Sequence, residues 1–229
     1  MSSQPESLLR RSQLARWHIA HDAVFESHAD RSVVTAYANE VVDALGLCDL
    51  SLLPRTGLKG RGAPKFMASL VSDLPQEPNI ALVTHDGTIV ARLSNEEFLI
   101  LGSLSFDSQV VADIEAATIS AMEKAAYPLP RADSHCLFAL VGAAAADAMA
   151  KLCEVDLRGR KFPPGSIAQT SIARVNGVVI SHNFGPRPGF FILCDTASTE
   201  YLWRSIIDAI DEYNGGAVGL QNITTAGPN

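Results

Sequence analysis

The sequence predicts an α+β fold of two repeated ferredoxin-like lobes, each with an antiparallel sheet that carries its helices on one face. Composition supports a large buried core, because hydrophobic residues make up 47% and charged residues 19% of the 229 residues. The order of elements supports the repeat. Both halves follow the order strand, turn glycine, helix, hairpin, strand and long helix, which is a split β-α-β pattern.

The repeat divides the chain into four parts. They are an N-terminal helical arm (1–45), a first α/β lobe (46–130), a second α/β lobe (131–222) and a tail (223–229). Within the arm, amphipathic stretches predict helices at 7–25 and 31–44. The boundary between the lobes falls at Tyr127-Pro128-Leu129-Pro130, because two prolines end the preceding helix there.

The first lobe is expected to contain a strand, a short helix, a hairpin and a long helix. Asp86-Gly87 is the turn of the hairpin, since this dipeptide favours two-residue turns. The predicted elements are a strand at 47–59, a helix from Pro64, hairpin strands at 80–84 and 88–93, a strand at 97–101 and a helix at 108–126.

The second lobe repeats this order with a hairpin turn at Asn176-Gly177. Ser198 is a good N-cap for its long helix, and Asn214-Gly215-Gly216 ends that helix. The predicted elements are strands at 136–141, 166–175, 178–182, 190–195 and 217–220, and helices at 143–153 and 199–213.

Charge, hydropathy and cysteine usage exclude some classes of protein. The net charge of −7 argues against a nucleic-acid partner, which normally requires a basic face. No run of 18 apolar residues predicts a membrane span. The four cysteines form no C-x-x-C pair, so we expect a reducing, cytoplasmic location. They are Cys48, Cys136, Cys153 and Cys194.

No catalytic, cofactor-binding or metal-binding residue is predicted. His18 and His21 are three residues apart, as zinc ligands on a helix can be, but no H-E-x-x-H pattern accompanies them. We therefore interpret them as solvated histidines of a surface helix. The nucleophile elbow G-x-S-x-G is also absent.

The segment from Asp156 to Gln169 combines cations, an aromatic ring and two adjacent prolines. Arginine and aromatic residues are enriched at interface anchors, and prolines reduce the entropy lost on docking. This pattern predicts a partner-contacting loop, with a solvated basic loop as the alternative. The candidate contact residues are Arg158, Arg160, Phe162, Pro163, Pro164 and Gln169.

The same loop carries a family resemblance. Phe162-Pro163-Pro164-Gly165-Ser166 and Ala168-Gln169-Thr170 resemble the gamma subunit of heterotetrameric sarcosine oxidases, and Glu200-Tyr201-Leu202-Trp203 is similar to the same family. Leu47-Cys48-Asp49-Leu50-Ser51, followed by Leu58-Lys59-Gly60, resembles the start of the glycine-cleavage T-protein fold. The resemblance covers residues 40–222. It implies a fold like the folate-binding domain of aminomethyltransferases.

The sequence departs from that fold family at the positions that handle folate. A Gly-Gly-x-x-Asp-Asp hairpin corresponds to Asp86 to Ala91, so Val90 and Ala91 replace the two aspartates. A Gly-Phe-Glu strand reads Gly189-Phe190-Phe191 here, and a Gly-Leu-x-x-Arg segment has Ile223 in place of its arginine. Because folate chemistry needs a carboxylate near the pterin, the resemblance implies a chain without that chemistry.

The resemblance implies a non-catalytic gamma subunit of a sarcosine-oxidase-like amine oxidase or dehydrogenase. Its expected partners are alpha and beta flavoprotein subunits and a small zinc-binding delta subunit. FAD, FMN, NAD and tetrahydrofolate are expected in those partners, with no cofactor in this chain. The alternatives are a divergent folate-dependent aminomethyl or methyl transferase, a stand-alone folate-binding protein, and an assembly module for iron–sulfur proteins. The motif typical of such assembly modules, Lys-Gly-Cys-Tyr-x-Gly-Gln, is absent from this sequence.

Overall fold

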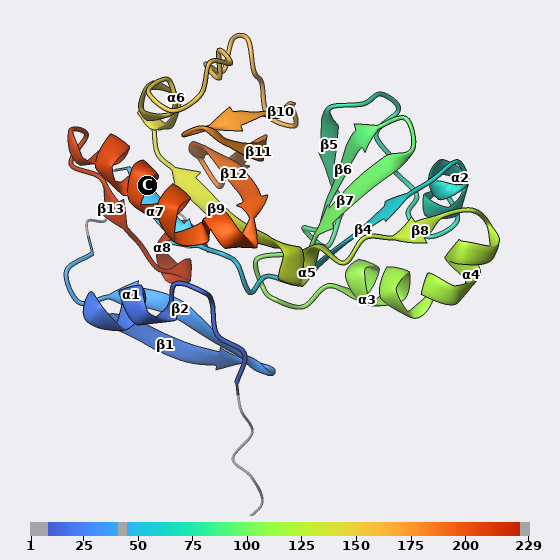
Figure 1. The fold of residues 1–229 in the computed structure, drawn as a ribbon, viewed down its shortest axis with the longest axis horizontal. Helices are drawn as coiled ribbons and strands as arrows, with labels where there is room; N and C mark the ends of the chain where they lie inside the picture. Colours follow the sequence, from blue (N-terminus) through green and yellow to red (C-terminus); the bar gives the residue numbers. More distant parts are fainter. Residues whose placement is uncertain (1–8, 41–44, 225–229) are drawn as a thin grey trace, which may run out of the picture.

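The computed structural model describes residues 9–40 and 45–224. Two antiparallel sheets lie side by side, and a small two-stranded sheet lies below one of them (Figure 1). This arrangement confirms the predicted α+β fold with antiparallel sheets and helices. Within the described residues, no helix has the length and hydropathy that crossing a bilayer requires.

The larger sheet has six strands, and four of its five neighbouring pairs are antiparallel. In spatial order they are β10 (Ile167–Ile172), β11 (Val175–Phe184), β12 (Arg187–Asp195), β9 (His135–Val141), β3 (Gly46–Asp49) and β13 (Gly216–Ala217). Its helices are α6 (Ala145–Met149) and α7 (Thr199–Asp211), with η1 (Thr196–Ser198) before α7. The pair β13–β3 is parallel.

The smaller sheet has five strands. In spatial order they are β5 (Ile80–Val83), β6 (Ile89–Ser94), β7 (Glu97–Leu101), β4 (Arg55–Lys59) and β8 (Tyr127–Pro128). Its helices are α2 (Ala63–Met67), α3 (Gln109–Ala116) and α4 (Thr118–Glu123), while α5 (Arg131–Ser134) lies between the sheets and α8 (Leu220–Thr224) follows β13.

Apolar side chains alternate between the two faces of the strands and form three apolar layers. In β9, Phe138 and Leu140 face the helices of the larger sheet, while Leu137 and Ala139 face the other sheet. In β6, Ala91 also faces the space between the sheets. Successive side chains of a strand point to opposite faces, so each sheet buries one face under helices and the other against its partner sheet.

The chain crosses between the sheets twice, which the predicted lobe boundaries did not foresee. The single strand predicted at 47–59 is two strands, because β3 belongs to the larger sheet and β4 to the smaller one. Pro54 lies between them, where its missing N–H interrupts a ladder. The chain returns through Leu129–Ser134 after β8 pairs with β4. The lobe predicted at 46–130 therefore contributes β3 to the second sheet.

The prediction of a wholly helical N-terminal arm is wrong. Among the residues of the arm that the structure describes, α1 (Ala15–Ala20) is the only helix, whereas β1 (Ala23–His28) and β2 (Arg31–Tyr37) form an antiparallel hairpin. The helix predicted at 31–44 is strand up to Tyr37, because Val33, Val34 and Thr35 are buried and β-branched residues fit a packed strand. Residues 41–44 lie outside the described chain.

The other elements follow the prediction more closely. The hairpin at Asp86-Gly87 is confirmed as β5 and β6, the strand at 97–101 is β7, and the long last helix is α7. The helix predicted at 108–126 begins after a Ser108 cap, whose hydroxyl accepts from the Val111 N–H, but it is divided at Ala117 into α3 and α4. The strand predicted at 217–220 ends at Ala217, and α8 follows.

Candidate functional site between the two sheets

Three positions that carry charged groups in the resembling family lie together in the layer between the sheets. Ala91 on β6, Phe191 on β12 and Ile223 on α8 are 0%, 1% and 2% exposed and belong to one apolar cluster. Val90 points the other way, under the helices of the smaller sheet. None of these side chains can donate or accept a proton, so the space holds no acid or base at these positions.

An aromatic group borders this layer. The rings of His182 and Phe184 are 4.8 Å apart between centroids, and both contact Phe191, at 5.1 Å and 4.9 Å. Burial lowers the pKa of His182 to about 4. The imidazole is therefore neutral at pH 7 and packs as an aromatic ring.

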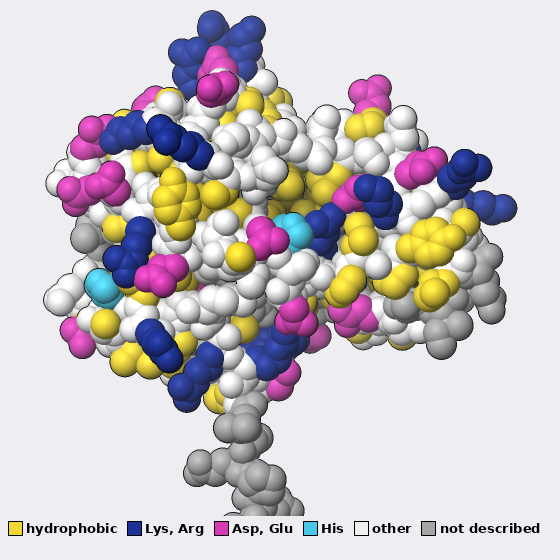
Figure 2. Space-filling model, viewed as in Figure 1, with side chains coloured by type: hydrophobic (Ala, Val, Ile, Leu, Met, Phe, Trp, Pro, Cys, Tyr) yellow, Lys and Arg dark blue, Asp and Glu magenta, His cyan; other side chains and the backbone are white. Residues whose placement is uncertain are grey.

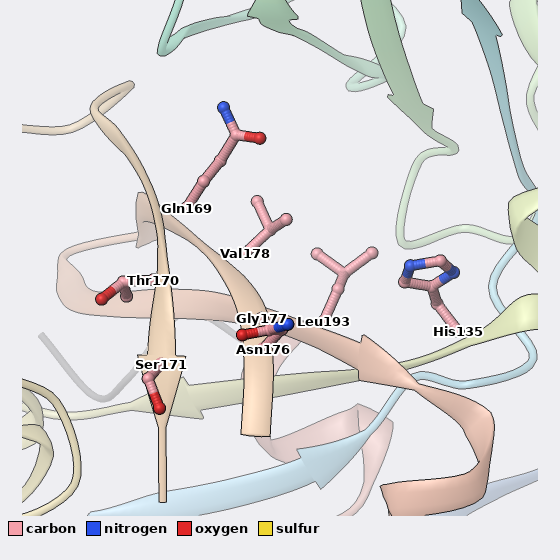
Figure 3. A pocket seen from close by; sticks show the side chains of 8 residues that line it. All are labelled: His135, Gln169, Thr170, Ser171, Asn176, Gly177, Val178 and Leu193. Atoms are coloured by element: carbon pink, nitrogen blue, oxygen red, sulfur yellow. The ribbon is translucent and has the colours of Figure 1, made fainter. Parts of the chain in front are cut away.

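A cleft of about 400 Å³ opens at one end of the same space. Figure 3 shows Gln169, Val178 and Leu193 projecting from three neighbouring strands toward one side, with His135 beside them. Hydroxyl, amide and imidazole side chains make up the polar part of the lining, and none of the lining residues is Asp, Glu, Lys or Arg. The lining residues are His135, Gln169, Thr170, Ser171, Asn176, Gly177, Val178 and Leu193.

A chain of polar contacts runs outward from His135. Its Nε2 is 3.0 Å from Nη1 of Arg131, and Nη2 of Arg131 is 2.6 Å from Oε1 of Glu97. Lys59 pairs with the other oxygen of Glu97 at 2.9 Å. Burial, followed by the positive charge of Arg131, lowers the pKa of His135, which favours the neutral ring that accepts from Arg131.

Arg55 joins the two crossing segments at the base of this space. It is 1% exposed and donates to five backbone carbonyls. The acceptors are Ser51 and Leu53 on one crossing and Arg131, Ala132 and His135 on the other. Burial lowers the pKa of Arg55 to about 10, so it stays charged at pH 7. It fixes the relative position of the sheets.

A second buried polar network corrects the interpretation of His18. This residue is not solvated: it is 0% exposed, its Nε2 lies 2.9 Å from Oδ2 of Asp49, and Tyr37 Oη lies 2.7 Å from its Nδ1. Ser12 also bonds Asp49. Burial would raise the pKa of Asp49, but the hydrogen bond and charge of His18, with bonds from Ser12 and Ser51, lower it below its ordinary value.

Asp49 lies between Ser12 and His18, so this serine is not placed as a triad nucleophile, which contacts the histidine directly. The hydroxyl that does contact His18 is that of Tyr37, and burial raises the pKa of that hydroxyl, so it stays protonated. His21 is exposed and stacks on Trp17 with centroids 3.8 Å apart. Within the described residues, no group of three or more His, Cys, Asp or Glu side chains is placed to hold a metal ion.

The candidate partner-contact residues divide into exposed and buried ones. Arg158, Arg160, Pro163 and Pro164 are exposed, and Arg158 pairs with Asp156 at 2.7 Å. Phe162 is 7% exposed and its ring lies 6.3 Å from that of Phe190. Its aromatic side chain therefore belongs to the core of the larger sheet and offers no exposed anchor in this structure.

Gln169 connects the two sheets. Its Nε2 donates to the Leu93 carbonyl at 2.7 Å and to Oδ1 of Asn79 at 2.9 Å. The contact role of the exposed members of this set stays a prediction. The residues that sequence reasoning missed are Arg55 and Asp49; a charged residue inside an apolar stretch was the available signal for each.

Two facing sheets, helices on their outer sides and an apolar layer between them define the class of fold that folate-binding aminomethyltransferases share. Residues 12–226 match the family model described as the GCVT N-terminal domain, and the chain belongs to that family.

Individual relatives agree with this assignment. An aminomethyltransferase from Saccharopolyspora erythraea is 23% identical over 228 residues, which cover 92% of this chain and 61% of that protein. The chain thus spans about three fifths of that curated relative. Among solved structures, aminomethyltransferase T of the glycine cleavage system from Bartonella henselae has a TM-score of 0.70 at 18% identity, covering 94% of this chain and 61% of that one.

The fold is also similar to that of a chain in the heterotetrameric sarcosine oxidase from Corynebacterium sp. U-96, solved in complex with pyrrole 2-carboxylate. The TM-score is 0.66 at 21% identity, and the match covers 96% of this chain and 99% of that one. At these identities, the likeness to the two solved structures shows a common fold.

Proposed function

We propose that this chain is a non-catalytic gamma subunit of a sarcosine-oxidase-like amine oxidase or dehydrogenase, and that it acts as a scaffold for larger flavoprotein subunits. The observation that carries the proposal is the filled space between the sheets. Ala91, Phe191 and Ile223 close it with apolar side chains that are at most 2% exposed. A scaffold needs the fold without the proton-transfer groups.

One solved structure supports the same proposal. A chain of a heterotetrameric sarcosine oxidase is similar to this chain over 96% of the residues of this chain, with a TM-score of 0.66. A subunit with this fold therefore exists within a heterotetrameric assembly. The proposed partners are alpha and beta flavoprotein subunits and a small zinc-binding delta subunit, which would hold FAD, FMN, NAD and tetrahydrofolate, in the cytoplasm.

Co-expression tests this proposal. The chain is co-expressed with the alpha, beta and delta subunits of a sarcosine-oxidase-type enzyme from the same organism, and the product is separated by size-exclusion chromatography. We expect one complex that contains flavin and this chain in equal proportion to the alpha subunit. A chain that elutes alone beside an assembled flavoprotein overturns the proposal.

Membership in the GCVT family favours one second candidate, a divergent folate-dependent transferase. Calorimetric titration of tetrahydrofolate into the purified chain separates the two. The scaffold predicts no saturable heat at micromolar ligand, because the layer between the sheets is already packed. Saturable binding with a micromolar Kd supports the transferase and contradicts the filled site.

A further inference from the structure

β10 is the edge strand of the six-stranded sheet. Other segments of this chain pair with the first and last residues of its free edge. At one end, the Ile167 N–H donates to the Asn79 carbonyl at 2.9 Å, next to an antiparallel bridge between Ile80 and Ser166. At the other end, the Ala173 N–H donates to the Leu152 carbonyl at 2.8 Å. Both ends of this edge are therefore closed by antiparallel pairing.

The middle of the same edge is open. Outward-facing N–H and C=O groups belong to every second residue of a strand, so after Ile167 and before Ala173 they belong to Gln169 and Ser171. Within residues 9–40 and 45–224, no group outside the sheet ladder bonds the backbone N–H or C=O of Gln169 or the N–H of Ser171. The open part of this edge thus offers two donors, the N–H groups of Gln169 and Ser171, and one acceptor, the Gln169 carbonyl, at the spacing of a strand.

The sequence of β10 lacks the features that keep strand edges from pairing. Natural edge strands carry lysine, proline or inward-pointing charges for this purpose. The segment Ile-Ala-Gln-Thr-Ser-Ile, from Ile167 to Ile172, contains none of these residues. Its open part is also accessible, since Gln169 and Ser171 are exposed.

The cleft beside this edge fits a neutral, amide-rich occupant. Gln169, Thr170 and Ser171 line it, no lining residue is Asp, Glu, Lys or Arg, and Val178 and Leu193 give it an apolar wall. A charged ligand would find no opposite charge among the lining side chains. A peptide backbone needs alternating donors and acceptors with uncharged surroundings, and these are present.

We infer that the open edge of β10 accepts an extended peptide segment of one of the larger flavoprotein subunits by β-strand addition. This inference rests on the proposed function, which supplies the partner. Ile167 and Ala173 are six residues apart, about 20 Å along a strand. With both ends closed, roughly three residues of the partner pair directly, and the rest of its segment leaves the edge on the solvent side.

Two substitutions at one position test the inference. Ser171→Pro removes the outward N–H without removing a ladder bond, because proline is tolerated on the free side of an edge strand, whereas Ser171→Ala keeps that N–H. Each variant is co-expressed with the alpha, beta and delta subunits, and its affinity for them is measured after purification. We expect at least a tenfold rise in Kd for Ser171→Pro and no change for Ser171→Ala.

The outcomes separate the two proposals. If the wild-type chain does not assemble, the proposed function fails. If the wild type assembles and a folded Ser171→Pro variant, with the wild-type Tm, assembles equally well, the strand-addition inference is wrong while the proposed function stands.

Hydrogen exchange covers the case in which Ser171→Pro unfolds. Measured on the wild-type chain alone and in the complex, the Gln169 and Ser171 amides should exchange at least tenfold more slowly in the complex. Equal exchange in both states overturns the inference.

Discussion

Nε2 of His18 lies 2.9 Å from Oδ2 of Asp49, and the two side chains are 0% and 2% exposed. This pair connects α1 to the end of β3, so the N-terminal segment is attached to the larger sheet at the strand next to its β13 edge. Tyr37 extends the network to β2, and burial raises the pKa of its hydroxyl well above the ordinary value. The tyrosine therefore remains a neutral partner of His18.

Removal of His18 is expected to destabilise the fold strongly. In His18→Ala, Asp49 stays buried without its partner, which costs about 3–5 kcal/mol of unfolding free energy. Urea denaturation measures the change. His21→Ala is the matched control: His21 is exposed on the same segment, and we expect a loss below about 1 kcal/mol. Equal losses in the two variants contradict the role of the buried pair.

Acid should weaken the protein in two separate pH ranges. The folded pKa of Asp49 lies below its unfolded value, so its contribution is present above pH 4 and is lost as pH falls through the folded pKa. His182 has a folded pKa of about 4, below the ordinary 6.5. The unfolded state therefore binds more protons between pH 6.5 and 4, and stability falls across that range by up to about 3 kcal/mol.

The His182→Phe variant isolates the upper range. It keeps an aromatic ring against Phe184 and Phe191 but cannot be protonated. Thermal unfolding from pH 7 to pH 4 should show a smaller fall in Tm for this variant than for the wild type. Parallel Tm profiles for the two proteins refute the assignment of this range to His182.

Arg55 is expected to matter more than other arginines of its sheet. Arg55→Ala leaves five carbonyls without their donor and should lower the unfolding free energy by about 3–5 kcal/mol. Arg55→Lys recovers part of this loss, since lysine has three donors and arginine five. Arg92 also donates to backbone carbonyls but is only half-buried, so Arg92→Ala should cost about 1–2 kcal/mol.

Restoring an acid between the sheets should not restore a ligand site. Phe191→Glu places a carboxyl group in a packed apolar layer and is expected to cost at least about 4 kcal/mol. Phe191→Leu, the size control, should cost about 1–2 kcal/mol. Chemical denaturation and tetrahydrofolate titration measure the two effects. A stable Phe191→Glu variant that binds tetrahydrofolate contradicts the packed layer.

Local signals predicted the parts of the fold that local interactions determine. Asp86-Gly87 located the hairpin of β5 and β6. Ser198 and Asn214 marked the bounds of α7, but the Ser198 side chain makes no cap hydrogen bond, and Asp195 caps the preceding η1 instead. The hairpin at 23–37 was missed because its strands are stabilised by contacts far away in the sequence, such as those of α8 with β2. Packing of this hairpin against a distant segment overrides helical propensity there.

The site could be predicted in part. Substitution at Ala91, Phe191 and Ile223 was visible from the family pattern, but their clustering required the structure. Phe162 was expected at a surface because it lies in a loop with cations and prolines, and yet its ring packs against Phe190. Asp49 contacts Ser12 and His18, which lie 37 and 31 positions away in the sequence, and no periodicity predicts such contacts.

The double crossing of the chain has a consequence for how the protein can be divided. A fragment that stops at residue 130 would carry β3 without the neighbour it pairs with, and a fragment that starts at 131 would leave a vacancy between β9 and β13. The first half of the chain thus contributes one strand, β3, to the sheet of the second half. We expect the whole chain to melt in a single cooperative transition. Fragments 1–130 and 131–229 should fold only when they are co-expressed.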